Sequence, residues 1–191
     1  MESKDPQREA EIERLVVESQ RGNADAFGKL YDLFVNMIFR YMHYRVGKQD
    51  SEDLTELVFL KTWEHIRKYR REAGTFSSWI FRIAHNIVVD HYRANQFQNV
   101  ELTENIQDYR SLANTVERTH RILDQEVLSL AMKELKDHYR QILILKYMND
   151  LSNEEIGGVM GKSQAALRIL QFRALRSLRR ILENKNVKGF E

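Results

Sequence analysis

Residues 152–182 read SNEEIGGVMGKSQAALRILQFRALRSLRRIL. Ser152 and Glu155 have the spacing of a capping box, in which each side chain bonds the backbone N–H of the other at a helix start. Gly161 is the residue type that ends a helix in the left-handed conformation, and Ser163 can cap the helix that follows. The stretch therefore predicts a short helix, a tight turn and a longer helix, which together make a helix-turn-helix.

The longer helix of this pair is amphipathic and basic. At 100° per residue, its core stripe contains Leu167, Leu170, Ala174, Leu178 and Ile181. The outward face then contains Ala165, Arg168, Ile169, Phe172, Arg173, Arg176, Arg179 and Arg180. An arginine-lined helix after such a turn suits the major groove of DNA, where arginine reads guanine edges or clamps phosphates. Ile169 and Phe172 could touch thymine methyl groups or dock a protein partner. The alternative is an ordinary solvated basic helix in a small bundle.

The composition predicts that the rest of the chain is helical as well. The 191 residues include one proline, Pro6, and no cysteine, so long helices need not be interrupted. Between Asn23 and Gly47, apolar residues recur every three or four positions, which predicts one long helix with a single buried face. The fold class is expected to be all-α, with two small helical domains.

We expect the first domain to be residues 1–95, a bundle of four helices. Asp50 is the predicted cap of the third helix, and the fourth runs from Phe76 to about Asn95. Residues 96–116 are polar and aperiodic, which predicts a flexible linker. Residues 117–191 then form the helix-turn-helix domain.

Charge is unevenly distributed along the chain, although the formal net charge is only +2. The segment 98–126 is mainly acidic, whereas residues 160–191 are strongly basic. Such asymmetry indicates separate modules, and the basic end fits a nucleic-acid partner.

The third predicted helix is apolar on two sides. Such a helix either lies at the centre of its bundle or packs its own domain on one side and a partner on the other. One side contains Leu54, Leu57 and Val58, and the opposite side contains Phe59, Trp63 and Ile66.

A second functional pattern lies in residues 74–86, GTFSSWIFRIAHN, and continues through DHYR at 90–93. Aromatic side chains alternate there with Arg, Asn and Ser. This mixture suits single-stranded nucleic acid, because bases stack on aromatic rings while cations follow the backbone. The alternative is that Phe76, Trp79 and Phe81 are core residues of the bundle.

The chain resembles a known family in three places. Residues 50–63, DSEDLTELVFLKTW, resemble the core-polymerase-binding helix in region two of extracytoplasmic-function sigma factors, a subfamily of the sigma-70 family. Residues 74–86 are similar to the promoter-melting segment that follows it. The last third of the chain resembles region four, which reads the minus-thirty-five element. The motifs occur in the family's order.

The resemblance implies a non-enzymatic RNA polymerase subunit that recognises promoters and starts transcription. Its implied partners are core RNA polymerase, promoter DNA and an anti-sigma factor. The residues implied to bind core polymerase are Asp50, Asp53, Glu56, Leu57, Phe59 and Leu60. Those implied for the minus-ten element and melting are Phe76, Ser77, Trp79, Arg82, Asn86 and Arg93. Those implied for the minus-thirty-five element are Ser163, Gln164, Arg168, Phe172, Arg173 and Arg176.

The chain departs from the family pattern at two places. Glu56-Leu57 stands where family members usually have Gln followed by an acid, so an expected carboxylate is missing at Leu57. Residues 165–170, AALRIL, replace the family's common Gly-Thr-Val-Lys-Ser-Arg run. The promoter sequence of typical members therefore does not transfer to this chain.

Other classes of protein fit the sequence less well. Without cysteine there is no thiolate metal site or nucleophile. The six histidines form no HExxH motif, so we expect no metal, cofactor or catalytic site. No apolar run reaches about 18 residues, and the N-terminus is charged, which predicts a cytoplasmic protein without membrane insertion. The alternative function is a helix-turn-helix repressor or activator with a ligand-sensing N-terminal domain.

Overall fold

The structure is a computed structural model that describes residues 6–98 and 127–185. Within these ranges the chain contains helices and turns and no strand, so the predicted all-α class is confirmed. The four helices of the first domain are α1 (Pro6–Gln20), α2 (Ala24–Val46), α3 (Lys48–His65) and α4 (Phe76–Gln98). Two short 3₁₀ turns, η1 (Ile66–Lys68) and η2 (Arg71–Ala73), connect α3 to α4.

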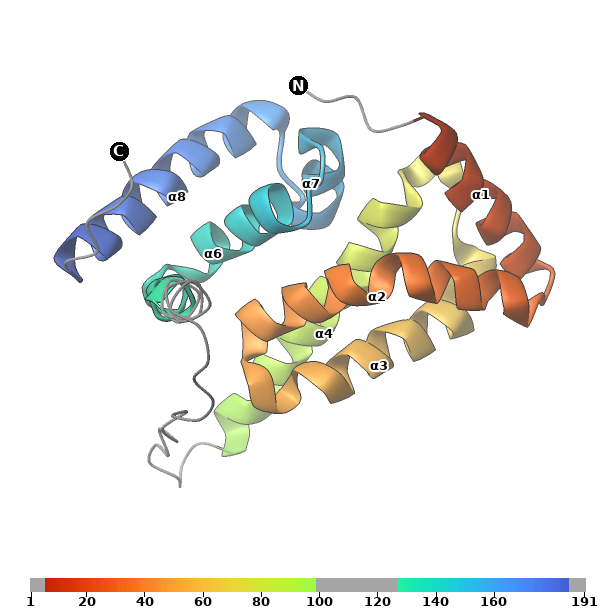
Figure 1. Ribbon diagram of the computed structural model, residues 1–191, viewed down its shortest axis with the longest axis horizontal. Helices are drawn as coiled ribbons and strands as arrows, with labels where there is room; N and C mark the ends of the chain where they lie inside the picture. Colours follow the sequence, from red (N-terminus) through yellow and green to blue (C-terminus); the bar gives the residue numbers. More distant parts are fainter. Residues whose placement is uncertain (1–5, 99–126, 186–191) are drawn as a thin grey trace, which may run out of the picture.

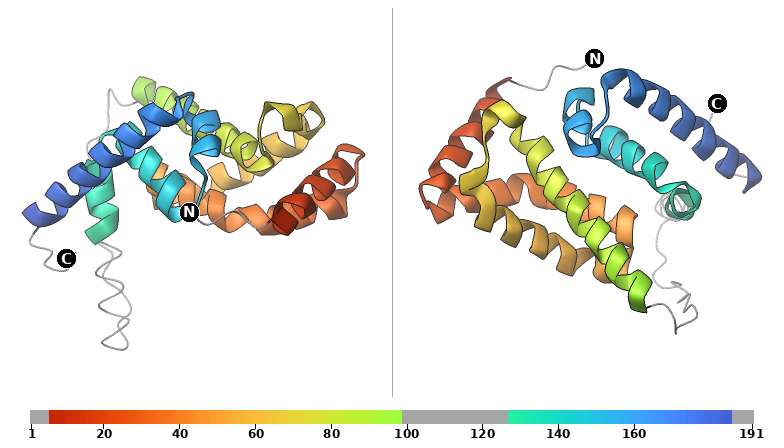
Figure 2. Two further views of the ribbon diagram at one scale, coloured as in Figure 1. Left: turned by 90° about the horizontal axis from the view of Figure 1, so that it is seen from above. Right: turned by 180° about the vertical axis from the view of Figure 1, so that it is seen from behind.

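In the first domain, α2 and α3 lie side by side, and α1 packs against α2 (Figure 1). Seen from behind, α4 crosses α2 and α3 (Figure 2). The buried face of α2 contains Leu30, Phe34 and Ile38, as its sequence periodicity predicted. Burying this stripe removes apolar surface from water, which is the main force that holds the bundle together.

Local residue chemistry sets the ends of α2. The side chain of Asn23 accepts a hydrogen bond from the backbone N–H of Ala26 at 3.1 Å, as an N-cap does. Gly47 has a φ of 93°, a conformation that favours glycine, and it separates α2 from α3.

Two predicted helix ends differ from the observed ones. The prediction that Asp50 caps the third helix is wrong, because α3 begins at Lys48 immediately after Gly47. Asp50 therefore lies in the first turn of α3, where its charge still complements the helix dipole. The fourth helix continues to Gln98, beyond the predicted end near Asn95.

The second domain contains the predicted helix-turn-helix. Residues 127–134 form a helix. The next elements are α6 (Asp137–Leu143), its π-helical continuation η3 (Ile144–Met148), α7 (Asn153–Met160) and α8 (Gln164–Asn184).

The predicted caps of α7 and α8 are present. The backbone N–H of Glu155 donates to Ser152 Oγ at 3.2 Å, and the backbone N–H of Ser152 donates to Glu155 Oε2 at 2.8 Å. Gly161 ends α7 with a φ of 62°. Ser163 Oγ accepts from the N–H of Ala166 at 3.3 Å and caps α8. These short-range bonds fix the turn between the two helices.

The two domains pack against each other. Helix α7 lies against α4, and η3 lies against α2, while α8 is on the outer side of the second domain (Figures 1 and 2). The hydroxyl of Thr75 donates to Glu155 Oε1 at 3.0 Å across this interface. Of the predicted linker, 96–116, only residues 96–98 are described, and they are helical.

We expect substitution of a buried leucine in the first domain to lower stability much more than substitution of an exposed one. Leu30 is 1% exposed, whereas Leu60 on α3 is 53% exposed. Leu30→Ala should lower the free energy of unfolding by about 2–5 kcal/mol through lost burial and a residual cavity. Leu60→Ala should change it by less than about 0.5 kcal/mol. Urea unfolding followed by circular dichroism measures both, and equal losses would contradict the observed packing.

Candidate nucleic-acid interface

Helix α8 presents the basic face that the sequence predicted. Leu167 and Ala174 are fully buried against α7 and α6. Every predicted minus-thirty-five residue is accessible to solvent. Ser163, Gln164, Arg168, Phe172, Arg173 and Arg176 are all exposed. The helix-turn-helix therefore holds an accessible row of cations on a fixed scaffold, which is what a phosphate-lined groove requires.

Apolar side chains interrupt this basic face. Phe172 is 67% exposed and Ile169 is 54% exposed, and Leu175 is exposed as well. The three lie three residues apart along α8, so they follow one side of the helix. An apolar strip among arginines fits either thymine methyl groups or a protein that covers the helix.

The predicted melting residues divide into core and surface. Phe76 is 1% exposed and packs against Phe34 and Tyr69, so its ring is part of the core. Ser77 is buried, and Trp79 is half-buried with its ring centroid 5.6 Å from that of Phe76. The alternative interpretation, that these aromatic residues are core residues of the bundle, therefore holds for Phe76 and also for Phe81, which is fully buried.

The remaining members of this set are accessible along α4. Arg82 is half-buried, and Asn86 and Arg93 are exposed. Arg93 lies 3.7 Å from Asp90 in a pair whose side chains are both largely in solvent, so this ion pair contributes little and can be exchanged for a phosphate. Asn86 lines a shallow groove between α3 and α4.

A basic loop between α3 and α4 was missed by the sequence analysis. Arg67, Lys68 and Arg70 are exposed there, next to the first turn of α4. The loop is held in place by Gln20, whose side-chain amide donates to the carbonyl oxygens of Ile66 and Tyr69, each at 3.0 Å. The run RKYRR at 67–71 is the sequence signal for this basic loop.

Tyr69 anchors the same loop. Its hydroxyl lies 2.9 Å from Glu13 Oε1 and 3.1 Å from the carbonyl oxygen of Gly74. Burial and then the hydrogen bond with the carboxylate of Glu13 raise the pKa of Tyr69 well above its usual value. The phenol stays protonated at neutral pH and works as a fixed hydrogen-bond donor, so the loop enters α4 in a defined conformation.

The predicted polymerase-binding residues lie on α3 with different exposure. Asp53, Glu56 and Leu60 are exposed, Asp50 and Leu57 are half-buried, and Phe59 is 5% exposed against the ring of Tyr31. Phe59 is therefore a core residue. Trp63, one turn beyond Phe59, is 38% exposed and packs edge-on against Phe27. The outward face of α3 thus combines two carboxylates with two large apolar side chains, Leu60 and Trp63.

Polar bonds across the domain interface involve the helix that carries the melting residues. Burial and then the nearby charge of Arg45 lower the pKa of His85 on α4. Its ring is therefore neutral at neutral pH, and Nδ1 can accept the hydrogen bond from the side-chain amide of Gln141, 3.0 Å away. Ser78 on α4 lies directly against Gly158 of α7. The first turns of α4 are thus partly covered by the second domain.

The described residues hold neither a metal cluster nor a membrane helix. Across residues 6–98 and 127–185, no three His, Asp or Glu side chains come together as they would around a metal ion. None of the helices in these ranges combines the length and apolar character that crossing a membrane requires.

Two family matches cover the two domains. Sigma-70 region 2 matches residues 30–98, and Sigma-70, region 4 matches residues 125–178. The first match contains most of α2 and all of α3 and α4, and the second contains α7 and most of α8. The alternative of a repressor with a ligand-sensing first domain is therefore not supported, because that domain is itself a region-2 domain.

The similarity to sigma factors of known class extends along most of the chain. The ECF RNA polymerase sigma factor BldN of Streptomyces coelicolor is 36% identical over 179 residues, which are 91% of this chain and 66% of BldN. SigM of Bacillus subtilis is 27% identical, with 83% of this chain and 96% of SigM covered. SigW of the same organism is 24% identical, with 91% and 97% covered.

Solved structures share the fold. CnrH in complex with the cytosolic domain of CnrY has a TM-score of 0.68 at 20% identity, covering 89% of this chain and 96% of that chain. The sigma factor RpoE in complex with the anti-sigma factor NepR from Bartonella quintana also has a TM-score of 0.68, at 17% identity, with 85% and 98% covered.

A region-2 bundle followed by a region-4 helix-turn-helix defines a transcription-initiation protein of the two-domain type. This chain belongs to the extracytoplasmic-function (ECF) subfamily of sigma-70 RNA polymerase sigma factors. Such proteins are not enzymes; they direct RNA polymerase to promoters and initiate transcription.

Two adjacent glycines give a test of the helix-turn-helix. A Cβ on Gly157 would lie 3.0 Å from the carbonyl oxygen of Lys162, which is backbone and cannot move freely, whereas a Cβ on Gly158 would meet Ser78 at 3.5 Å. We expect Gly157→Ala to lower the unfolding free energy and weaken duplex binding. Gly158→Ala should be neutral or raise stability by up to about 1 kcal/mol, because alanine favours a helix. Thermal unfolding and duplex titration measure both, and the opposite order would contradict the observed turn.

Proposed function

We propose that the chain binds its partners through three separate surfaces, one for core polymerase, one for the minus-ten element and one for the minus-thirty-five element. Residues 1–95 are the region-two domain, 96–116 the linker and 117–191 the region-four domain. The first domain binds core polymerase and opens the minus-ten element, and the second holds the minus-thirty-five element. The observation that carries the proposal is the presence of two separate cationic surfaces on two domains. Tethering two weak DNA modules gives high affinity only when both elements are correctly spaced.

Duplex recognition is assigned to the outward face of α8. Ser163, Gln164 and Arg168 lie at its N-terminal end, where a recognition helix enters the major groove. Arg173 and Arg176 follow on the same exposed side and would neutralise phosphates. Phe172 would add apolar contact beside them.

Capture of unpaired bases is assigned to α4 and the loop before it. Asn86 and Arg82 supply polar groups, and the half-buried ring of Trp79 supplies a stacking edge. Arg93 and the exposed basic loop at 67–70 would follow the backbone of the separated strand. Phe76 and Ser77 support this surface from within the first turn of α4.

Core polymerase is assigned to the outward face of α3. Asp53, Glu56 and Leu60 lie there with Trp63, and Asp50 and Leu57 lie at its edges. Charged residues around exposed apolar ones are typical of a protein interface. Phe59 would contribute by holding this helix against α2.

An anti-sigma factor is the further partner that we propose, since the solved structure of RpoE contains one. The apolar strip of Ile169, Phe172 and Leu175 on α8 is a surface that such a partner could cover. We also place the protein in the cytoplasm, where core polymerase works.

Run-off transcription with purified core polymerase tests the proposed function. Transcripts from a cognate promoter should appear only when this protein is added to core enzyme. Duplex binding by the protein alone, with no promoter-dependent transcript from any fragment of a genomic library, would contradict it.

We expect variants of the two DNA surfaces to fail at different steps. Arg168→Ala or Arg173→Ala should weaken minus-thirty-five duplex binding by about 1–3 kcal/mol, yet leave transcription from a pre-melted template largely intact. Asn86→Ala should impair opening and spare upstream duplex binding. All three side chains are exposed, so folding should be preserved. Open-complex formation on ordinary and pre-melted promoters compares them, and identical defects in both sets would contradict the division of labour.

We expect charge reversal on α3 to weaken polymerase binding. Asp53→Lys combined with Glu56→Lys should reduce affinity for core enzyme at least tenfold. The two substitutions replace exposed carboxylates of the proposed interface with positive charges, which repel the groups that the carboxylates attract. The matched control is Asp25→Lys with Asp32→Lys, two exposed acids on α2, which should bind as the unaltered protein does. A pull-down with core enzyme measures binding, and circular dichroism checks the fold; equal loss in both pairs would exclude a local α3 contact.

A further inference from the structure

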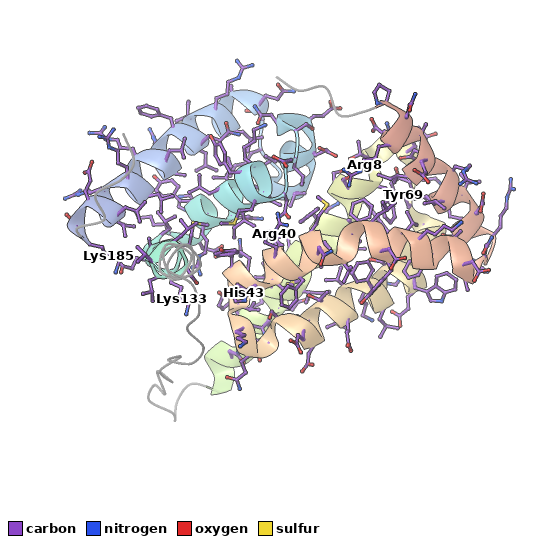
Figure 3. The ribbon with its side chains drawn as sticks, in the orientation of Figure 1. Arg8, Arg40, His43, Tyr69, Lys133 and Lys185 are labelled. Carbon is purple, nitrogen blue, oxygen red and sulfur yellow. The ribbon has the colours of Figure 1, made fainter. Side chains whose placement is uncertain are left out.

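A small cavity of about 220 Å³ lies where the C-terminal end of α2 meets the second domain. The first domain contributes residues from α2 and α4, and the second contributes residues from the helix at 127–134 and from α6. Figure 3 labels His43 and Lys133, which stand on the two sides of this junction. The polar residues of the lining are His43, Tyr44, Arg45, Tyr92, Ser129, Lys133 and Arg140.

The polar lining is cationic. Arg45, Lys133 and Arg140 carry full charges, and no residue in the described lining is acidic. Burial and then the charges of Lys133 and Lys48 lower the pKa of His43, which is the response of a histidine in a positive field. Ser129 adds a hydroxyl group. The hydroxyl of Tyr92 already donates to the backbone carbonyl oxygen of Arg45, so the donors that the cavity offers come mainly from its cations.

The guanidinium of Arg45 is incompletely paired. The residue is 2% exposed, and its Nη2 lies 3.1 Å from Asp137 Oδ2. Its Nε and Nη1 are buried without a hydrogen-bond partner, and so is Nε of Arg140. Asp137 covers one edge of the Arg45 guanidinium, and its own side chain is 54% exposed. A buried charged donor left unpaired is costly, so an acceptor beside these nitrogens would stabilise the interface.

We propose that this cavity is a binding site for a phosphate-bearing anion that bridges the two domains. Arginine, lysine and hydroxyl donors without a competing carboxylate in the lining are the groups that recognise phosphate oxygens. The cavity has room for one such group, and not for a base pair. Nothing in the assigned DNA or polymerase surfaces uses these residues.

The site exists only while the domains are packed together, because each domain supplies part of the lining. A ligand that binds only this arrangement raises its population relative to the separated domains by the factor 1 + L/Kd, where L is the free ligand concentration and Kd its dissociation constant. In this arrangement α7 covers Ser78 and the first turn of α4. The anion would therefore disfavour strand capture; this consequence rests on the proposed function, whereas the binding site does not.

Titration calorimetry of the full chain with inorganic pyrophosphate tests the site. Lys133→Glu should lower the affinity at least tenfold, because it places a carboxylate in the lining. Lys133 is exposed, so the fold should persist, as circular dichroism can verify. Lys136→Glu, an exposed lysine outside the lining, and Arg179→Ala with Arg180→Ala on α8 should bind as the unaltered protein does. The proposal is overturned by undetectable binding, or by equal loss in Lys133→Glu and Lys136→Glu.

A distance measurement tests the bridge. Because the chain has no cysteine, Asp32→Cys on α2 and Glu183→Cys on α8 give two unique positions for spin labels. Pyrophosphate should narrow the distance distribution of this labelled protein, and Lys133→Glu should abolish the effect. Binding without any change in the distribution would refute a bridging anion. Neither measurement needs polymerase or a promoter, so a failed transcription assay leaves both results interpretable.

A short duplex without promoter elements identifies the source of the phosphate. If the duplex displaces pyrophosphate with the same dependence on Lys133, the natural anion is a DNA backbone phosphate. If it does not compete, the site serves a free phosphate compound.

Discussion

Helix α2 contacts α1, α3 and α4 in its own domain and η3 in the other. Its buried stripe from Leu30 to Met42 is the surface on which the first domain assembles. The same helix then brings a charged residue, Arg45, into the interface between domains. Packing of α2 therefore fixes the positions of α3 and α4, and with them the proposed polymerase and strand-capture surfaces.

The interface between the domains combines apolar burial with polar bonds of long sequence separation. Arg40 donates to the carbonyl oxygen of Met148, Thr75 to Glu155, and Gln141 to His85. The interface covers part of α4, so if α4 captures the separated strand as proposed, promoter opening requires the domains to separate or shift. A protein whose active arrangement is only fractionally populated binds with an affinity lowered by that fraction. On the proposed function, a core polymerase that held the two domains apart would remove this penalty, and DNA binding would then depend on the complete enzyme.

Structural features that depend on residues close in sequence could be predicted, whereas contacts between residues far apart in sequence could not. The caps at Ser152 and Ser163 and the stop at Gly161 involve residues at most four apart, so spacing alone identified them. The start of α3 was misplaced because an acidic residue and a glycine compete for the same boundary, and the positive φ of Gly47 decides it.

Where a helix has several apolar faces, the sequence pattern also could not show which apolar residues are buried. Phe59 and Phe76 were assigned to binding surfaces, yet both fill the core, since their partners Tyr31 and Phe34 come from α2. The exposed face of α8 was predicted because its periodicity is strong and its two sides differ sharply in chemistry. No periodicity in the sequence predicted that the two domains pack against each other.

The residues around Leu57 explain in physical terms why leucine stands where the family usually has a carboxylate. Leu57 is half-buried and lines the groove between α3 and α4 together with Leu54, Ile83 and Ile87. A carboxylate at this position would lose part of its hydration against three aliphatic side chains, whereas leucine adds apolar contact with them. Glu56, one position earlier, points into solvent and keeps negative charge on the outward side of α3. If the outward face of α3 binds polymerase as proposed, its negative charge is displaced by one residue around the helix, and the groove gains apolar surface beside Asn86.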